Sequence, residues 1–305
     1  MFNSRVMTTA AILAAGLGTS AAQAEAYYEA SIWGMYVVPT NVNYNHPNDC
    51  IDEDTDYCSN SNGFGLSFSA YNPLQNGNAL IFDFLYEYHD ETDDVNEIRV
   101  GDAKHGQLGF HYVWEQGSQP WGVFGFLAEG YSNEEDGEFE TGEAYYPVVG
   151  LGLETIISGY AIQVGHARMI GTDTDDDDRE GVESMTFARV SRSWDLWNGQ
   201  LFAGIAGGFG DFEQSPTSKD DGTWLQFEAI YSAPLTVGSA NASWFVGVTS
   251  DWMRVNDVDD TDVEKARLNA FKFGLNFPFG KAGTKAAPFS TPNFRAVFTN
   301  AAELD

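Results

Sequence analysis

The segment ALIFDFLYEYH at residues 79–89 and the segment HGQLGFHYVWE at residues 105–115 each alternate between two kinds of side chain. One set is largely aromatic, and the other contains aspartate, glutamate, glutamine and histidine. Successive side chains of an extended strand point to opposite faces. An apolar face toward lipid and a polar face toward the interior is typical of a transmembrane β-barrel strand. A soluble β-sandwich would reverse this, with the aromatic face in a core and the polar face in water.

Two kinds of connection separate the strand-like segments. Short ones with almost no charge lie near residues 75, 118, 157, 197 and 237, and longer acidic ones lie near residues 51, 97, 138, 176, 216 and 258. Each series recurs about every 40 residues, and the two alternate. We therefore predict one all-β domain, an antiparallel up-and-down transmembrane barrel of about twelve strands, with ten or fourteen as alternatives. A β-propeller would need four short strands in each interval, whereas the sequence has two long ones.

The N-terminus has the pattern of a secretory signal peptide. Arg5 is its only charged residue, an alanine-rich apolar stretch follows, and Ala22-Gln23-Ala24 matches an A-x-A cleavage site. No segment has the ~18–20 consecutive apolar residues of a membrane helix. We predict that residues 1–24 are removed on export and that residues 25–279 form the barrel, since a barrel also pairs every backbone group in lipid.

The charge is strongly acidic and unevenly distributed. The net charge is −30 with a pI near 4.2, which argues against nucleic acid as a partner. Most of the 45 acidic residues fall in the long connections, whereas the short ones contain only Asp195. This difference predicts a barrel with two chemically distinct ends, its short turns and both termini in the periplasm and its acidic loops outside.

Two groups of loop residues are candidates for cross-linking or cation binding. Cys50 and Cys58 share the first acidic connection, which in an exported protein predicts a disulfide, with free thiols or a metal pair as alternatives. Clustered aspartates supply the oxygen ligands that Ca²⁺ prefers. The candidate ligands for weakly bound Ca²⁺ are Asp173, Asp175, Asp177, Asp257 and Asp259. No EF-hand pattern is present, so a solvated acidic surface is the alternative, and we predict no other cofactor.

Polar residues on the inward-facing set are the candidate lumen residues. Symmetric pairing about the acidic connection would place His89 opposite His105, Glu87 opposite Gln107, and Asp83 opposite His111. Further predicted inward charges are Glu129, Glu228 and Asp251, with Arg267 and Lys272 as basic partners. Such groups either form a hydrogen-bonded network that fills the lumen or filter ions and respond to pH.

Two strand-like segments depart from simple alternation. In residues 183–194, Met185 and Phe187 disagree in parity with Val190 and Trp194. In residues 264–279, the apolar set changes parity after Ala270. A one-residue β-bulge near Ala270 would explain the second case.

The pattern Phe271-x-Phe273-x-Leu275-x-Phe277-x-Phe279, together with the alternation over residues 25–279, resembles bacterial outer-membrane β-barrel proteins of the porin-like kind. The resemblance implies an outer-membrane location among phospholipid and lipopolysaccharide, and recognition of the aromatic last strand by the barrel-assembly machinery. The chain departs from the family by continuing to Asp305. We predict that residues 280–305 form a periplasmic tail or a partial lumen plug.

Three functions follow from this interpretation. The leading hypothesis is passive, cation-preferring passage of small solutes, because an acidic mouth concentrates cations. The alternative is a closed structural or surface-interaction barrel whose loops bind divalent cations, lipopolysaccharide or a partner; His166 and Arg168 would suit lipopolysaccharide phosphates. The third is an outer-membrane lipid hydrolase, which needs a nucleophile beside a histidine. No local sequence pattern supplies one, so we predict that the protein is not an enzyme.

Overall fold

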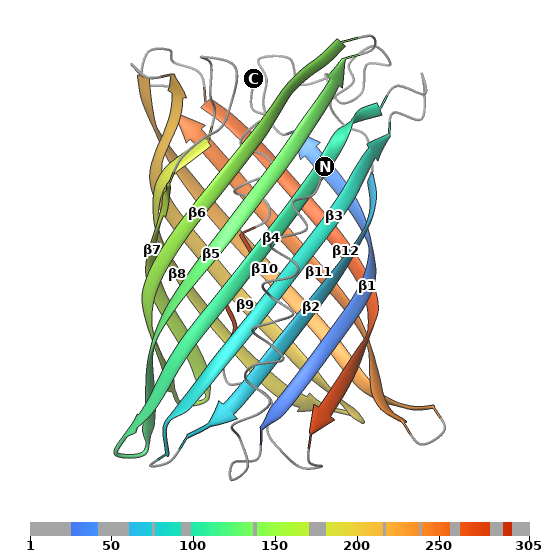
Figure 1. Cartoon of the computed structure of the whole chain (residues 1–305), viewed down its shortest axis with the longest axis vertical. Coiled ribbons are helices and arrows are strands. Elements are labelled where there is room, and N and C mark those ends of the chain that lie inside the picture. The colour runs from blue at the N-terminus through green and yellow to red at the C-terminus, as the bar shows by residue number, and fades with distance from the viewer. Residues whose placement is uncertain are drawn as a thin grey trace.

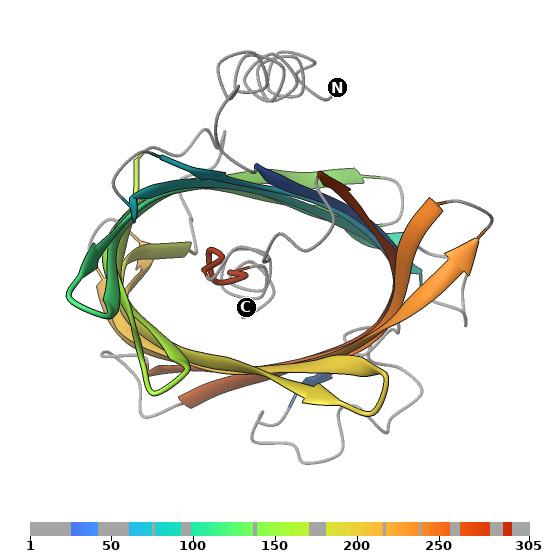
Figure 2. The same cartoon turned by 90° about the horizontal axis from the view of Figure 1, so that it is seen from below.

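The computed structural model describes residues 26–41, 61–74, 77–92, 99–136, 139–170, 181–215, 218–237, 240–256, 263–280 and 289–294. These residues contain twelve strands: β1 Tyr27–Asn41, β2 Ser61–Pro73, β3 Ala79–Thr92, β4 Arg99–Gln116, β5 Gln119–Asp136, β6 Phe139–Ile157, β7 Tyr160–Met169, β8 Gly181–Leu196, β9 Gly199–Ser215, β10 Ser218–Val237, β11 Ala240–Asn256 and β12 Val263–Gly280. Each strand pairs antiparallel with the next, and β12 pairs with β1 to close the barrel (Figures 1 and 2). The predicted twelve-stranded barrel is confirmed.

One end of the barrel is built from tight turns. Two-residue turns join β4 to β5, β6 to β7 and β8 to β9. Such hairpin turns require positive φ, and Ser158 and Gly159 have φ values of 54° and 81°. Tyr27 of β1 pairs with Gly280 of β12 at this same end. The barrel wall therefore begins and ends at the rim that carries the short turns.

The outer face of the barrel is apolar. Along β5, Val123 and Leu127 are exposed, whereas Phe124, Phe126 and Ala128 are buried. The same alternation leaves large apolar side chains exposed around the wall, including those of Ile32, Leu151, Leu153, Val164, Ile205, Phe209, Phe271 and Phe273. An apolar surface of this extent would be unstable in water. Its natural solvent is the hydrocarbon of a membrane.

The inner face combines polar groups with a large apolar cluster. The cluster contains Trp33, Met35, Val37, Phe124, Phe126, Met185, Phe187, Trp224, Phe245, Met253 and Leu268. It accounts for the apparent parity conflict in β8, because Met185 and Phe187 point inward while Val190 and Trp194 point outward. The alternation itself is unbroken there. The lumen is therefore packed with apolar as well as polar side chains.

The predicted bulge near Ala270 is wrong. Ala270 pairs with Val37 on one side and Thr249 on the other, and both ladders continue through it without a shift. Leu268 and Ala270 face inward and Phe271 faces outward, so a single parity describes the strand. Register shifts occur instead at Glu91/Thr92, Asn133/Glu134, Val182/Ser184 and Ser218/Lys219. All of these lie near the ends of strands that lead to the longer loops.

Several predictions concern parts of the chain outside the described residues. These are the signal peptide at residues 1–24, the Cys50–Cys58 disulfide and the positions of the two chain termini. They stay predictions. Across the ranges that the structure describes, no helix is long and apolar enough to cross a membrane.

A charge on the outer apolar face should destabilise the barrel according to its depth. Leu151 is 69% exposed on β6, and Ile170 is 62% exposed just beyond the loop end of β7. Leu151→Arg should cost about 2–4 kcal/mol of unfolding free energy, and Ile170→Arg about 0–1 kcal/mol, because arginine near the rim reaches the lipid headgroups. Reversible denaturation in lipid vesicles measures both. Equal losses would mean that the outer face does not contact lipid as inferred.

Candidate functional site in the barrel lumen

A short segment of the chain, residues 289–294, lies inside the ring of strands (Figure 2). We call it the lumen segment. Its first residue, Phe289, packs with Ala79, Ile81 and Val113 near the short-turn end. Its last residue, Phe294, is fully buried in the large apolar cluster. The lumen segment therefore follows the barrel axis and bridges two apolar regions of the wall.

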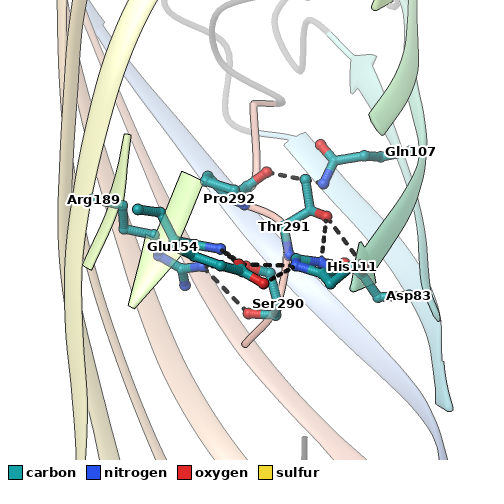
Figure 3. Close-up of polar contacts among 9 residues, drawn as sticks. Asp83, Gln107, His111, Glu154, Arg189, Ser290, Thr291 and Pro292 are labelled. Atoms are coloured by element: carbon teal, nitrogen blue, oxygen red, sulfur yellow. Dashed lines mark hydrogen bonds and ion pairs between the residues drawn. The ribbon is translucent and has the colours of Figure 1, made fainter. Parts of the chain in front are cut away.

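The wall binds the backbone of the lumen segment through long polar side chains (Figure 3). An extended peptide without strand neighbours needs partners for its buried carbonyl groups. Four wall side chains donate to them: Gln163 Nε2 to Ser290 O at 3.1 Å, Arg189 Nη1 to Ser290 O at 3.0 Å, Gln107 Nε2 to Pro292 O at 2.9 Å, and Gln226 Nε2 to Asn293 O at 2.8 Å. These donors come from β7, β8, β4 and β10, so the lumen segment is held from several sides.

His111 is the centre of a buried ionic cluster. Its Nδ1 lies 2.9 Å from Glu154 Oε2, and its Nε2 lies 3.1 Å from Asp83 Oδ1. Asp83 also accepts from the Thr291 backbone N–H at 2.9 Å and from the Thr291 hydroxyl at 3.1 Å. An imidazole donates from both nitrogens only when it is protonated. When protonated, His111 donates to both carboxylates and so links Glu154 to the carboxylate that binds Thr291.

Two further ion pairs cross the lumen wall next to the segment. Lys272 of β12 pairs with Glu87 of β3, and Glu87 also accepts from Asn293 Nδ2 at 3.0 Å. Arg189 Nη2 lies 3.2 Å from Glu228 Oε2 while its Nη1 binds the segment. Buried charges are costly unless they are paired. Here each pair also carries a contact to the lumen segment.

Asp251 is buried on the inner face of β11 and accepts two hydrogen bonds from β10. Trp224 Nε1 donates at 3.0 Å and Gln226 Nε2 at 2.8 Å. Because Gln226 also binds the carbonyl of Asn293, Asp251 orients a side chain that holds the segment. Its contribution to the site is indirect.

A glycine makes room for the lumen segment on β4. A Cβ atom added at Gly109 would lie 1.9 Å from the Thr291 hydroxyl and 2.1 Å from Asp83 Oδ1. At Gly106, on the same strand but facing outward, an added Cβ would meet nothing within 4 Å. Gly109 is therefore a point of close approach that any larger residue would obstruct.

The predicted pairing between β3 and β4 is wrong. Each β3 residue up to Glu91 pairs with the β4 residue two positions before the predicted one. Glu87 lies opposite His105, Leu85 opposite Gln107, and Ile81 opposite His111. The inward parity is the same, so Asp83 still reaches His111 as a diagonal neighbour across the ladder. The shift at Glu91/Thr92 changes the register at the loop end of this hairpin, and symmetric counting about the loop could not anticipate it.

The structure places the remaining predicted lumen residues as follows. His89 and His105 are buried, and His89 Nδ1 lies 3.2 Å from Ser61 Oγ. Glu228 and Asp251 face inward, as described above. Glu129 does not: it is exposed and shares its parity with Leu127, so it lies on the outer face and its prediction as a lumen residue is wrong. Irregular spacing of polar residues in β5 had hidden the true parity.

Several residues of the site were missed by the sequence analysis. They are Glu154, Gln163, Arg189, Gln226, Thr291 and Asn293. Single polar residues in otherwise apolar strands were available as a signal: Gln163 lies between Ile162 and Val164, and Glu154 shares the inward parity of Val148. Of the two proposed basic partners, Lys272 faces the lumen, whereas Arg267 stacks on Trp252.

The candidate metal ligands Asp173, Asp175, Asp177, Asp257 and Asp259 all lie outside the described residues. Among the residues that the structure does describe, no group of three or more His, Cys, Asp or Glu side chains is arranged to hold a metal ion. His166 and Arg168 lie on the outer face, where His166 Nδ1 contacts Thr186 Oγ1 at 3.0 Å and Arg168 lies 3.7 Å from Glu183.

Comparisons with known proteins find similarity only among solved structures. No protein-family model matches the chain, and no curated protein matches it in sequence. The translocator domain of the autotransporter NalP from Neisseria meningitidis covers 90% of this chain and 96% of its own, with 9% identity and a TM-score of 0.42. A TodX monoaromatic hydrocarbon channel deltaS2 mutant covers 85% and 91%, with 8% identity and a TM-score of 0.41. Outer membrane phospholipase A from Escherichia coli covers 81% and 92%, with 11% identity and a TM-score of 0.38. Similarities this low carry no argument about the function of this chain.

The fold itself defines the class of protein. A closed antiparallel barrel whose side chains alternate between an apolar outer face and a charged, hydrogen-bonded interior is built to span a lipid bilayer. The protein is a transmembrane β-barrel. Its distinguishing feature is a lumen occupied by residues of its own chain.

Removal of the imidazole of His111 should destabilise the barrel strongly. His111→Leu leaves Asp83 and Glu154 buried without their shared cation, which should cost about 3–5 kcal/mol. His166→Leu is the matched control, because His166 is exposed on the outer face; it should change stability by no more than about 0.5 kcal/mol. Denaturant unfolding of both variants in vesicles is the measurement. Similar small effects for both would show that His111 does not hold the cluster together.

Proposed function

We propose that this protein is an outer-membrane channel for small solutes, with a preference for cations, whose lumen is occluded by residues 289–294. The observation that carries the proposal is the occupant itself. About eight strands enclose a lumen that side chains fill, and about sixteen leave an open channel. A twelve-stranded wall lies between these limits, and here a segment from beyond β12 lies in the lumen and packs against side chains of the wall.

The charges of the inner wall support the preference for cations. The inward-facing carboxylates near the lumen segment are those of Asp83, Glu87, Glu154, Glu228 and Asp251. The basic groups beside them are Arg189, Lys272 and, when protonated, His111. A lumen with an excess of carboxylates attracts cations and disfavours anions. Acidic outer loops, as the sequence predicts, would act in the same direction.

The second candidate is a permanently closed structural barrel. The buried apolar cluster around Phe294 favours it, because such packing is stable and would resist hydration. Conductance separates the two candidates directly. We retain the proposals that lipopolysaccharide, the barrel-assembly machinery and weakly bound Ca²⁺ are partners of the protein.

We also propose that the protein is not an enzyme. Among the described residues, Ser61 makes a serine–histidine contact, with its Oγ 3.2 Å from His89 Nδ1. Both side chains are 1% exposed, so a lipid acyl group could not reach Ser61 without a rearrangement. This observation supports a channel or a closed barrel over a lipid hydrolase.

Loosening the lumen segment should open the channel. In planar bilayers the full-length protein should show small or rare conductance steps, and the full-length Phe289→Ala/Phe294→Ala variant should show larger or more frequent ones, because both apolar anchors are lost. The control is Phe271→Ala/Phe273→Ala, which removes two phenylalanines from the outer face of β12 and should leave conductance unchanged. If the anchor variant inserts but stays silent, the protein is a closed barrel.

The ion preference should depend on a named inward carboxylate. In the open Phe289→Ala/Phe294→Ala background, Glu228→Gln removes one negative charge beside Arg189 and should reduce the cation-selective reversal potential in a KCl gradient. Glu129→Gln makes the same chemical change on the outer face and should have no effect. Identical reversal potentials for all three proteins would show that these lumen charges do not set selectivity.

A further inference from the structure

We propose that the lumen is a binding site for an extended peptide with two phenylalanines separated by four residues, and that residues 289–294 are one occupant, which a second peptide of this pattern can replace. The proposal goes beyond conduction: the site would bind such a peptide whether or not the barrel conducts ions. It rests on how the wall recognises the lumen segment.

The first element of recognition is a set of neutral amide donors aimed at the backbone. Gln107, Gln163 and Gln226 come from three different strands, and each donates to a main-chain carbonyl of the lumen segment. Primary amide donors match peptide carbonyls, and because they bind main-chain atoms they accept many sequences. A barrel filled only by its own side chains would not require three such donors directed to one peptide.

The second element is a pair of chemically different sites for phenylalanine. The ring of Phe294 stacks on Phe126 with centroids 4.9 Å apart and an interplanar angle of 17°, and meets Phe187 edge-on at 4.9 Å. Trp224 completes this aromatic site at 5.5 Å. Phe289 instead occupies a mainly aliphatic site formed by Ala79, Ile81 and Val113, against which Tyr71 also packs. Aromatic rings are common anchors in recognition, and two distinct sites at a fixed spacing would set both the register and the direction of a peptide.

The third element of recognition is a set of contacts with the residues between Phe289 and Phe294. Asp83 accepts from the backbone N–H and the hydroxyl of Thr291, and Glu87 accepts from the side-chain amide of Asn293. Gly109 leaves space for Thr291 against the wall. The site therefore favours a hydroxyl two residues after the first phenylalanine and an amide just before the second. The ligand is an extended polypeptide segment of the pattern Phe-Ser-Thr-Pro-Asn-Phe.

Nothing in these contacts requires the peptide to be part of the same chain. The wall atoms in these hydrogen bonds belong to side chains, which a free peptide could contact as well as a tethered one. The tether matters through effective concentration, which for a short linker is in the millimolar range. A free peptide should therefore compete poorly with the intact segment and bind well once the two anchors of that segment are removed.

The experiment uses full-length protein and an acetylated, amidated hexapeptide with the sequence of residues 289–294, followed by isothermal titration calorimetry. The Phe289→Ala/Phe294→Ala protein should bind the peptide at least about tenfold more tightly than the wild-type protein does. A scrambled hexapeptide of the same composition, and one with both phenylalanines replaced by alanine, should bind at least tenfold more weakly. Equal binding of the scrambled peptide, or no binding to the folded variant, would overturn the proposal.

A pair of wall variants locates the binding event. In the Phe289→Ala/Phe294→Ala background, Gly109→Leu should abolish binding because the new side chain occupies the position of Thr291. Gly106→Leu introduces the same side chain on the outward face of the same strand and should leave the affinity unchanged. If neither variant loses affinity for the peptide, or if both do, the lumen is excluded as the binding site.

A measurement on the wild-type protein covers the case in which the anchor variant does not fold. Hydrogen–deuterium exchange of the lumen segment, followed by mass spectrometry, should accelerate in millimolar free hexapeptide and stay constant in the scrambled one. If neither peptide changes the deuterium uptake of the lumen segment, the free peptide does not replace that segment. If the peptide binds and the barrel is silent in bilayers, the binding site stands and the channel proposal fails.

Discussion

The width of a twelve-stranded barrel is the constraint on which the rest of this structure depends. Strand number fixes the internal diameter, and protein interiors are close-packed, with few voids larger than a water molecule. The inward side chains of Phe126, Phe187 and Trp224 surround the ring of Phe294, and Phe126 also contacts Phe187 directly. Without the lumen segment, these apolar side chains would face water or the barrel would have to flatten. The lumen segment thus packs the interior of the barrel as well as obstructing passage through it.

The polar contacts then determine the direction in which the lumen segment runs. Main-chain carbonyls are held by amides and by Arg189, whereas the carboxylates of Asp83 and Glu87 bind N–H and O–H donors of the segment. The carbonyl groups of the segment therefore meet donors, and its N–H and O–H groups meet carboxylates. Reversing the peptide would place carbonyl groups against carboxylates. Gly109 adds a steric condition at the closest approach. The lumen is specific for this segment because packing, hydrogen bonding and charge all favour the same position and direction of the peptide.

The sequence predicted the barrel well because its signal is local. Alternation in residues 79–89 assigned inward and outward faces correctly, and the spacing of connections predicted twelve strands. It failed where the answer depended on distant residues. The register of β3 on β4 is shifted near a loop end, and Glu129 lies in a strand whose polar spacing is ambiguous. The assumption of a polar lumen hid the inward facing of Met185 and Phe187. The contacts of Thr291 and Asn293 join residues more than 200 positions apart, and no periodicity in a single sequence encodes them.

Occlusion and the proposed cation preference are consequences of the same side chains. The lumen segment satisfies Asp83 and Glu87 with neutral donors, so it meets their hydrogen-bonding needs without cancelling their charge. Arg189, Lys272 and His111 compensate only part of the negative charge on the wall. When the segment leaves, the exposed carboxylates must find other donors, and water with associated cations is what a hydrated lumen supplies. The groups that bind the segment are therefore the groups that would hydrate the open path and select cations within it.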